Sequence, residues 1–190
     1  MSGTATRLRT RTDLALALPI LAGVCMLLLR LRILEVPNAT RIVLLVAVFA
    51  TILVASLLVP ATRDVARLHP AFVAVVGLAG VGLAALAGGR PVAAPLGAAA
   101  LPLALLAAVA EEALFRKAAY GWLARSGPMI AVAGSALLFA AVHVPLYGVA
   151  AFPVDLGAGL LLSWQRWASG SWTVPAATHA AANALAVMLR

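Results

Sequence analysis

Seven long apolar runs follow one another along this chain of 190 residues, and they constrain its fold more than any other feature. They cover roughly residues 14–34, 42–60, 71–88, 95–115, 128–148, 152–166 and 173–189. A membrane-crossing helix needs about 20 mainly apolar residues, whereas an open sheet would leave backbone groups unpaired in lipid. We therefore predict an all-α fold, a polytopic transmembrane helical bundle with about seven membrane segments, in a range of about six to eight.

Composition narrows the partners that such a chain can have. Hydrophobic residues make up 64% of it and charged residues 11%, so charged side chains are too few to cover a soluble surface. The net charge of +8 comes from basic residues scattered between the runs, without the clustered face that phosphate binding needs. We predict membrane lipid and no nucleic acid as a partner, and a single integral membrane domain over residues 1–190.

The basic residues between the runs also predict a topology. Placing them on alternate sides of the membrane favours a cytoplasmic N-terminus, because nine of the fourteen then lie on the cytoplasmic side: Arg7, Arg9, Arg11, Arg63, Arg67, Arg116, Lys117, Arg125 and Arg166. The short sixth run leaves open a re-entrant segment, which would reverse the last one. Arg30 and Arg32 close the first run without a small-residue cleavage site, so we predict a retained membrane helix in place of a signal peptide.

Ionisable residues inside the runs carry the functional signal, because charged groups in lipid tend to be paired, inward-facing and functional. Glu111 and Glu112 lie late in the fourth run, and adjacent residues on a helix diverge by about 100°. Glu112 and Arg116 share a face and can form an ion pair, which leaves Glu111 to face a cavity as a general base. The alternative is a charged helix end at the membrane interface, marked by Arg116 and Lys117.

Two other runs carry histidines. His143 lies deep in the fifth run, and a proline two residues later fits a helix that ends or kinks beside a polar cavity. There His143 can share a proton or a water molecule with Glu111. His179 and Asn183 are one turn apart in the last run, and two such donors suit a developing oxyanion. The alternatives are a histidine used in helix packing and polar contacts between helices.

Asp155 and a tryptophan cluster have structural interpretations. Asp155 lies near the start of the sixth run, and we interpret it as a capping or interfacial residue instead of a catalytic one. Trp164, Trp167 and Trp172 gather near the end of that run with Arg166. Such a cluster is typical of an interfacial aromatic belt.

Three motifs in a specific order carry a resemblance to a known family. Glu-Glu-x-x-x-Arg comes first, Phe-x-x-x-His second and His-x-x-x-Asn third, each on a separate run. Together with the segment from Phe152 to Asn183, they resemble the CPBP family of CAAX proteases and bacteriocin-processing enzymes, which includes the Ras-converting prenyl protease. The resemblance covers about residues 95–188, half of the chain, and marks them as the predicted catalytic core.

This resemblance implies an intramembrane endopeptidase of the glutamic type, a type formerly described as metal-dependent. Four residues would be catalytic: Glu111, His143, His179 and Asn183. Glu111 would be the general base and His143 would help to activate the water, while the other two would stabilise the oxyanion. Three residues would orient the site or touch the substrate: Glu112, Arg116 and Phe139.

The resemblance leaves the cofactor open. One glutamate and two histidines are also a plausible zinc set, which would be Glu111, His143 and His179. The chain has no His-Glu-x-x-His sequence. We therefore favour hydrolysis without a cofactor and keep a zinc-dependent form of the same protease as the alternative.

A membrane-anchored peptide or protein substrate is implied as well. Three classes suit the family: prenylated C-terminal CAAX tails, bacteriocin or quorum peptides, and C-terminal sorting tails of exported proteins. The composition, rich in alanine and arginine, suggests a bacterial inner membrane and favours a peptide precursor or a sorting tail. We expect water to enter through a cavity open to the cytoplasm near Arg116 and Lys117. The non-enzymatic alternatives are a membrane scaffold or bacteriocin immunity protein, and a transporter that uses the same residues.

Overall fold

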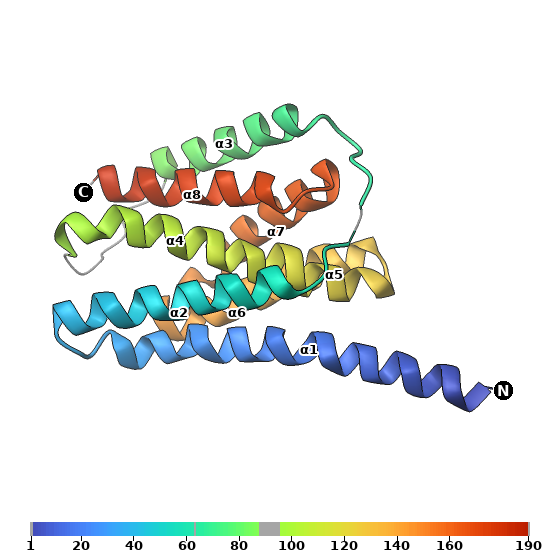
Figure 1. The fold of residues 1–190 in the computed structure, drawn as a ribbon. Coiled ribbons are helices and arrows are strands. Elements are labelled where there is room, and N and C mark those ends of the chain that lie inside the picture. Colours follow the sequence, from blue (N-terminus) through green and yellow to red (C-terminus); the bar gives the residue numbers. More distant parts are fainter. Residues whose placement is uncertain (1, 63, 88–95, 190) are drawn as a thin grey trace.

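Successive long helices run in opposite directions along one bundle (Figure 1). The computed structural model describes residues 2–62, 64–87 and 96–189, and side chains of residues 16–62, 64–83 and 96–189. All regular structure in these residues is helical. The α-helices are α1 (Ser2–Ile33), α2 (Asn38–Leu58), α3 (Pro70–Ala87), α4 (Ala100–Glu112), α5 (Tyr120–Leu123), α6 (Pro128–Tyr147), α7 (Phe152–Ser169) and α8 (Thr173–Met188).

The helices confirm the predicted fold class. Four helical stretches of the described chain are long and apolar enough to cross a membrane: Leu16–Ile33, Asn38–Leu58, Gly97–Ser126 and Pro128–Tyr147. The apolar helix Pro70–Leu83 is shorter, and the predicted run boundaries at 88 and 95 lie outside the described residues. The predicted end near residue 115 is wrong, because the helix continues to Ser126 with Arg116 and Lys117 buried inside the bundle.

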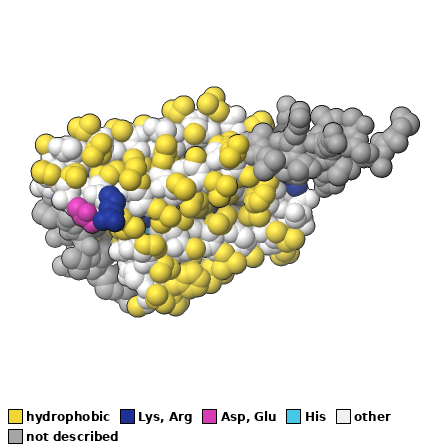
Figure 2. All heavy atoms as spheres, turned by 90° about the horizontal axis from the view of Figure 1, so that it is seen from below, with side chains coloured by type: hydrophobic (Ala, Val, Ile, Leu, Met, Phe, Trp, Pro, Cys, Tyr) yellow, Lys and Arg dark blue, Asp and Glu magenta, His cyan; other side chains and the backbone are white. Residues whose placement is uncertain are grey.

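The outside of the bundle is suited to lipid. Figure 2 shows a face on which apolar side chains predominate, with Lys or Arg beside Asp or Glu at its left-hand end. An exposed pair of this kind lies at the C-terminal end of α1, where Arg32 Nη1 is 3.8 Å from Oε2 of Glu35. Charged groups thus lie at an end of the bundle, where water is available.

A π-helical turn, Ala113–Ala119, follows Glu112 directly and widens the fourth helix. π-helical turns occur often at functional sites. Within it, the Nζ of Lys117 donates hydrogen bonds to three carbonyl oxygens at the end of α2, those of Ser56, Leu57 and Val59. A cation satisfies and complements the free carbonyls of a helix C-terminus. Lys117 therefore holds the end of α2 in place and is not an exposed charge at the helix end.

The loop between α2 and α3 packs on the end of α7. Arg166 pairs with Asp64 at 2.5 Å between Nη2 and Oδ2, and its Nε donates to the carbonyl of Arg116 at 3.1 Å. Gly170 ends α7 with φ of 69°, and a Cβ there would lie 2.7 Å from the carbonyl oxygen of Asp64. Arg166 is thus buried and joins α7 to this loop and to the fourth helix.

Close approach of α3 to α7 and α8 depends on Gly77. A Cβ at Gly77 would lie 2.1 Å from Nε2 of Gln165, whereas Gly82 has no neighbour within 4 Å. The Gln165 amide donates to the Val73 carbonyl at 3.0 Å and to the Thr178 hydroxyl at 2.9 Å. Gly77 therefore permits a buried hydrogen-bonded junction of α3 with α7 and α8, and a Cβ at Gly80 would lie 3.1 Å from Cδ2 of Leu161 on α7.

Candidate active site

A cavity of about 640 Å³ lies inside the bundle. All four predicted catalytic residues line it: Glu111, His143, His179 and Asn183. Its wall also includes four other polar side chains: Arg30, Arg41, Asp155 and Tyr147. Three separate helices, α4, α6 and α8, thus bring the predicted residues to one cavity, although they come from three distant motifs.

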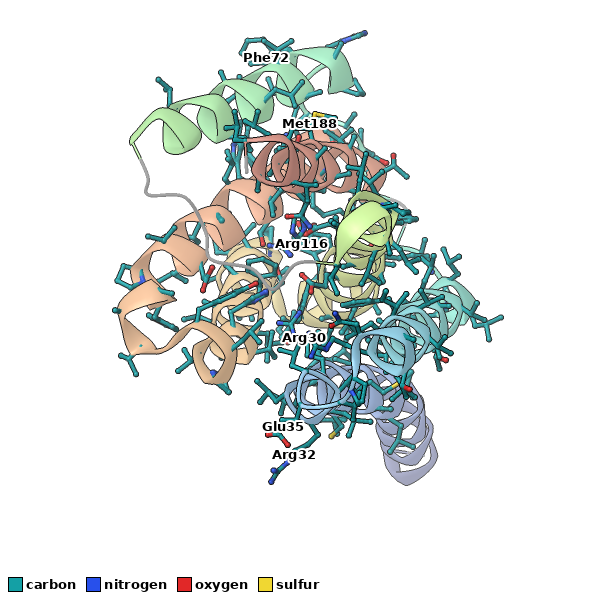
Figure 3. The ribbon with its side chains drawn as sticks, turned by 90° about the vertical axis from the view of Figure 1, so that its left-hand side faces the viewer. Arg30, Arg32, Glu35, Phe72, Arg116 and Met188 are labelled. Carbon is teal, nitrogen blue, oxygen red and sulfur yellow. The ribbon has the colours of Figure 1, made fainter. Side chains whose placement is uncertain are left out.

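The cavity reaches the end of the bundle that carries the turn between α1 and α2. Its lining includes Leu34 after α1, Leu96 before α4 and Val187 near the end of α8. Figure 3 looks at this end, where Arg30 points inward between the helices and Arg32 points away. Arg116 and Lys117, near which we expected an opening, are both buried and do not line this cavity.

Glu111 is held from the first helix. The Nη1 of Arg30 donates to its Oε1 at 2.9 Å, and both side chains are almost fully buried. From the sequence, Arg116 was paired with Glu112 and no cation was assigned to Glu111. The ion pair between Arg30 and Glu111 is therefore a feature that only the structure shows. Its second oxygen, Oε2, lies 3.7 Å from Nε2 of His143. That separation is too long for a direct hydrogen bond and suits a water molecule bound to both atoms.

The tautomer of His143 follows from its other nitrogen. Nδ1 lies 2.7 Å from the carbonyl oxygen of Phe139, one turn earlier on α6. A carbonyl can only accept, so Nδ1 carries the proton. In the neutral ring, Nε2 then has a lone pair directed toward Glu111, which is the arrangement needed to accept a proton from water.

Glu112 does not line this cavity and forms a fully buried ion pair with Arg116, called the sealed pair below. Its Oε1 accepts a hydrogen bond from Nη1 of Arg116 at 2.9 Å, as their spacing predicts, and lies 2.9 Å from Nδ1 of His179. Arg116 also donates to the carbonyl of Gly159 at 3.1 Å. Neither Glu112 nor Arg116 has any exposed side-chain surface. This pair fixes the rotation of the fourth helix, which keeps Glu111 on the cavity wall.

His179 and Asn183 reach the cavity from α8. Since the Glu112 carboxylate accepts from Nδ1 of His179, Nε2 is the ring nitrogen left for other partners. Asn183 donates one amide N–H to the carbonyl of Ala104 at 3.0 Å, and an amide nitrogen has a second N–H. Both side chains are therefore anchored to α4. His179 keeps Nε2 and Asn183 keeps one amide N–H for another partner.

Phe139 lies at the centre of the site. Its ring centroid is 4.5 Å from that of His143 and 5.8 Å from that of His179. The guanidinium carbon of Arg116 lies 4.6 Å from the same centroid. One aromatic ring thus contacts both histidines and covers the buried cation.

Asp155 was interpreted as a capping or interfacial residue, and the structure corrects the capping part. It lies in the first turn of α7, which has no side-chain cap hydrogen bond. Instead it lines the cavity and interacts electrostatically with His143, Glu111 and Arg30. Sequence spacing offered no signal for this placement, because the carboxylate belongs to no motif.

The zinc alternative needs three ligands at one point. The described residues contain no group of three or more His, Cys, Asp or Glu side chains placed to hold a metal ion. Of the set considered from the sequence, His143 faces Glu111 whereas His179 is bonded to Glu112. These donors do not fit a single zinc ion in this arrangement, and we derive no step through a metal.

Comparison with known proteins identifies one similar family. A family model described as type II CAAX prenyl endopeptidase Rce1-like matches residues 93–185. That range includes all three motifs and excludes α1, α2 and α3, so Arg30 comes from outside it. No curated protein and no solved structure matches the chain. The match and the apolar helices together indicate an integral membrane protease of the CAAX type.

Proposed function

Because residues 93–185 belong to the type II CAAX prenyl endopeptidase Rce1-like family, we propose that this membrane protein hydrolyses peptide bonds with a water molecule activated by Glu111. The observation that carries the proposal is the pair of facing atoms on the cavity wall. Glu111 Oε2 and His143 Nε2 lie 3.7 Å apart and can both accept a hydrogen bond from one water. Glu112 is excluded as the base because it does not line the cavity.

The reaction then proceeds in two steps. Glu111 takes a proton from the water while the water oxygen attacks the scissile carbonyl carbon, which becomes tetrahedral. The C–N bond breaks next, and the proton held by Glu111 passes to the leaving nitrogen. The products are a carboxylic acid and an amine, so atoms and charge balance without another reactant.

His179 and Asn183 stabilise the oxyanion of the tetrahedral intermediate. Asn183 offers its second N–H, and His179 offers Nε2–H in the form whose ring carries both protons. Fixed donors in a site shielded from water can lower a barrier by about 3 kcal/mol each. Glu112 and Arg116 act in this proposal as positioning residues, and Phe139 supports both histidines.

Substrate class follows from the side of the membrane to which the cavity opens. With the N-terminus in the cytoplasm of a bacterial inner membrane, the end that carries the turn between α1 and α2 faces outward. The tail of an exported protein or a peptide precursor would then reach the site more directly than a cytoplasmic tail. Membrane-impermeant labelling tests this orientation: with Cys25 replaced by alanine, Glu35→Cys should react from outside the cell and Arg125→Cys should not. The reverse pattern would favour a cytoplasmic CAAX-type tail.

The central test is a cleavage assay with the purified chain in lipid vesicles and a library of membrane-anchored tails. We expect cleavage by the wild type, its loss in Glu111→Ala and His143→Ala, and a partial loss in Glu112→Ala. Unchanged cleavage by Glu111→Ala would reject the mechanism. Metal content is measured in parallel, and stoichiometric zinc whose removal abolishes cleavage would favour the zinc-dependent form. No cleavage of any tail would favour a scaffold or immunity protein.

A further inference from the structure

The π-helical turn Ala113–Ala119 connects the two carboxylates to an anchor elsewhere in the bundle. Glu111 and Glu112 lie directly before the turn, whereas Lys117 within it is fixed to the end of α2. A π-helical turn bonds to the fifth residue and not to the fourth, so it holds one extra residue, and one residue of an α-helix corresponds to a rotation of about 100°. Return of the turn to the α-helical form would therefore rotate the carboxylates relative to Lys117 and take Glu111 off the cavity wall.

The α-helix resumes at Tyr120, whose backbone N–H distinguishes the two forms. This N–H donates to the carbonyls of Phe115 and Lys117. In an α-helix its partner would be the carbonyl of Arg116, four residues earlier. That carbonyl instead accepts a hydrogen bond from a side chain of α7, since Nε of Arg166 donates to it at 3.1 Å. Arg166 thus occupies the acceptor on which the α-helical form depends.

Helix α7 holds Arg116 at its main chain and at its side chain. Nη2 of Arg116 donates to the carbonyl of Gly159 at 3.1 Å, while Arg166 donates to the Arg116 carbonyl. Gly159 and Arg166 are about two turns apart on α7, so they lie on the same face of it, and both are buried. Because Nη1 of Arg116 donates to Glu112, α7 is linked to the sealed pair through one residue of the turn.

The guanidinium of Arg166 is itself oriented by the loop between α2 and α3. Its Nη2 donates to Oγ1 of Thr62 at 2.9 Å and pairs with Oδ2 of Asp64. Its Cζ lies 5.0 Å from the centroid of the Tyr120 ring. A guanidinium is planar, so contacts that fix Nη2 and the plane also fix the direction of Nε–H. The loop therefore directs the Nε–H toward the turn.

Resting on the proposed function, we propose that Arg166 is a positioning residue for hydrolysis. Its Nε–H holds the carbonyl of Arg116, which keeps the π-helical turn and so keeps Glu111, and not Glu112, on the cavity wall. Arg166 does not line the cavity, so it acts through the turn and not on the substrate. Loss of the Nε–H should therefore lower kcat with little effect on KM.

Two substitutions separate the contact with the turn from the contact with the loop. Arg166→Gln places an amide N–H at the position of Nε but loses the charge that pairs with Asp64, whereas Arg166→Lys keeps the charge and has a methylene group in place of Nε. In reconstituted vesicles, Arg166→Lys should lower kcat about 10- to 100-fold and leave KM within about twofold. Arg166→Gln should keep kcat within about threefold of the wild type, because the bond to the Arg116 carbonyl is retained.

Hydrogen exchange of the full chain in detergent, followed by mass spectrometry, measures the turn without any cleavage. Arg166→Lys should speed exchange about tenfold over residues 113–123 and leave α2 and α6 unchanged. Arg67→Gln is the matched control, because Arg67 joins the same loop to α7 through the Trp167 carbonyl at 2.7 Å without contacting the turn. It should leave both kcat and the exchange of residues 113–123 unchanged.

Wild-type kcat and exchange in Arg166→Lys, an equal loss of kcat in Arg166→Gln and Arg166→Lys, or faster exchange throughout the bundle would each overturn the assignment. If Arg166→Lys does not fold, Arg166→Met combined with Asp64→Asn removes both charges and the Nε–H, and should show the same loss of kcat. A wild type that cleaves tails while Arg166→Lys cleaves equally well would refute this inference and leave the proposed function intact. If the wild type cleaved no tail, the proposed function would fail, and exchange alone would decide whether Arg166 holds the turn.

Discussion

Glu111 and Glu112 are neighbours in the chain, and each has one arginine and one histidine beside it. Arg30 and Arg116 each donate to their glutamate at 2.9 Å. The histidines differ, since His179 is hydrogen-bonded to Glu112 at 2.9 Å whereas His143 is 3.7 Å from Glu111. Glu111 lines the cavity, and Glu112 does not.

This difference shows how one pair of residue types serves two purposes. On the Glu112 side the groups are in direct contact and without exposed surface, so they act as a buried structural pair. On the Glu111 side, the carboxylate and the imidazole are 3.7 Å apart without a direct hydrogen bond, and both line the cavity. The same groups can therefore act together on a ligand in the cavity. The arginine of the sealed pair is four residues away in the chain, and that of the open pair is 81 residues away.

The largest effect is expected on the open side. Glu111→Gln keeps the size of the side chain and its contact with Arg30 but removes the base, so cleavage should fall by about 10³-fold or more. The measurement is kcat in reconstituted vesicles, with the unfolding midpoint in an SDS titration as the control for folding. If the loss of cleavage were fully explained by the fraction of the variant that is unfolded, Glu111 would be a structural residue like Glu112.

The second prediction concerns the sealed side. Glu112→Gln and Arg116→Gln each leave one buried charge without its partner, which should cost about 3 kcal/mol of unfolding free energy. The SDS titration measures this loss. Glu112→Gln combined with Arg116→Met removes both charges and should recover much of the stability. If the double variant were as unstable as the sum of the single ones, the pair would not act as a unit.

Local spacing explains which parts of the site the sequence could predict. Glu112 and Arg116 pair because i and i+4 share a helix face, and His179 and Asn183 reach one cavity for the same reason. Arg30 could not be assigned, because an arginine at the end of an apolar run has the same pattern whether it points into the bundle or into water. Its exposed neighbour Arg32 illustrates the second case.

The fold was predictable for a related reason. Apolar run length alone indicates helices in a membrane, and seven long helical segments are present in the described chain. The end of the fourth helix was missed because Arg116 and Lys117 resemble a membrane boundary until their buried partners are known. Tertiary partners far apart in the chain also decide at which end the cavity opens.

A smaller effect is expected from Asn183. Asn183→Ala removes one N–H from the proposed oxyanion site, and the rate should fall about 10- to 100-fold, with little change in the affinity for substrate. Loss of the bond to the Ala104 carbonyl should also lower stability by about 1 kcal/mol. Comparison of kcat with KM measures the first effect. A change confined to KM would place Asn183 in substrate binding.

The smallest effect is expected at Tyr147, which tests how tightly the open side is held. Its ring stacks on His143 with centroids 5.7 Å apart and planes at 12°, and such a contact contributes about 0.5–1.5 kcal/mol. Tyr147→Leu should loosen the imidazole that faces Glu111 and lower kcat about threefold, while the free energy of unfolding falls by only about 1 kcal/mol. Phe72→Leu replaces an aromatic ring of similar exposure on α3, far from the cavity lining, and should leave kcat unchanged. An equal loss in both variants would mean that the effect does not come from His143, and that the carbonyl of Phe139 alone fixes the ring.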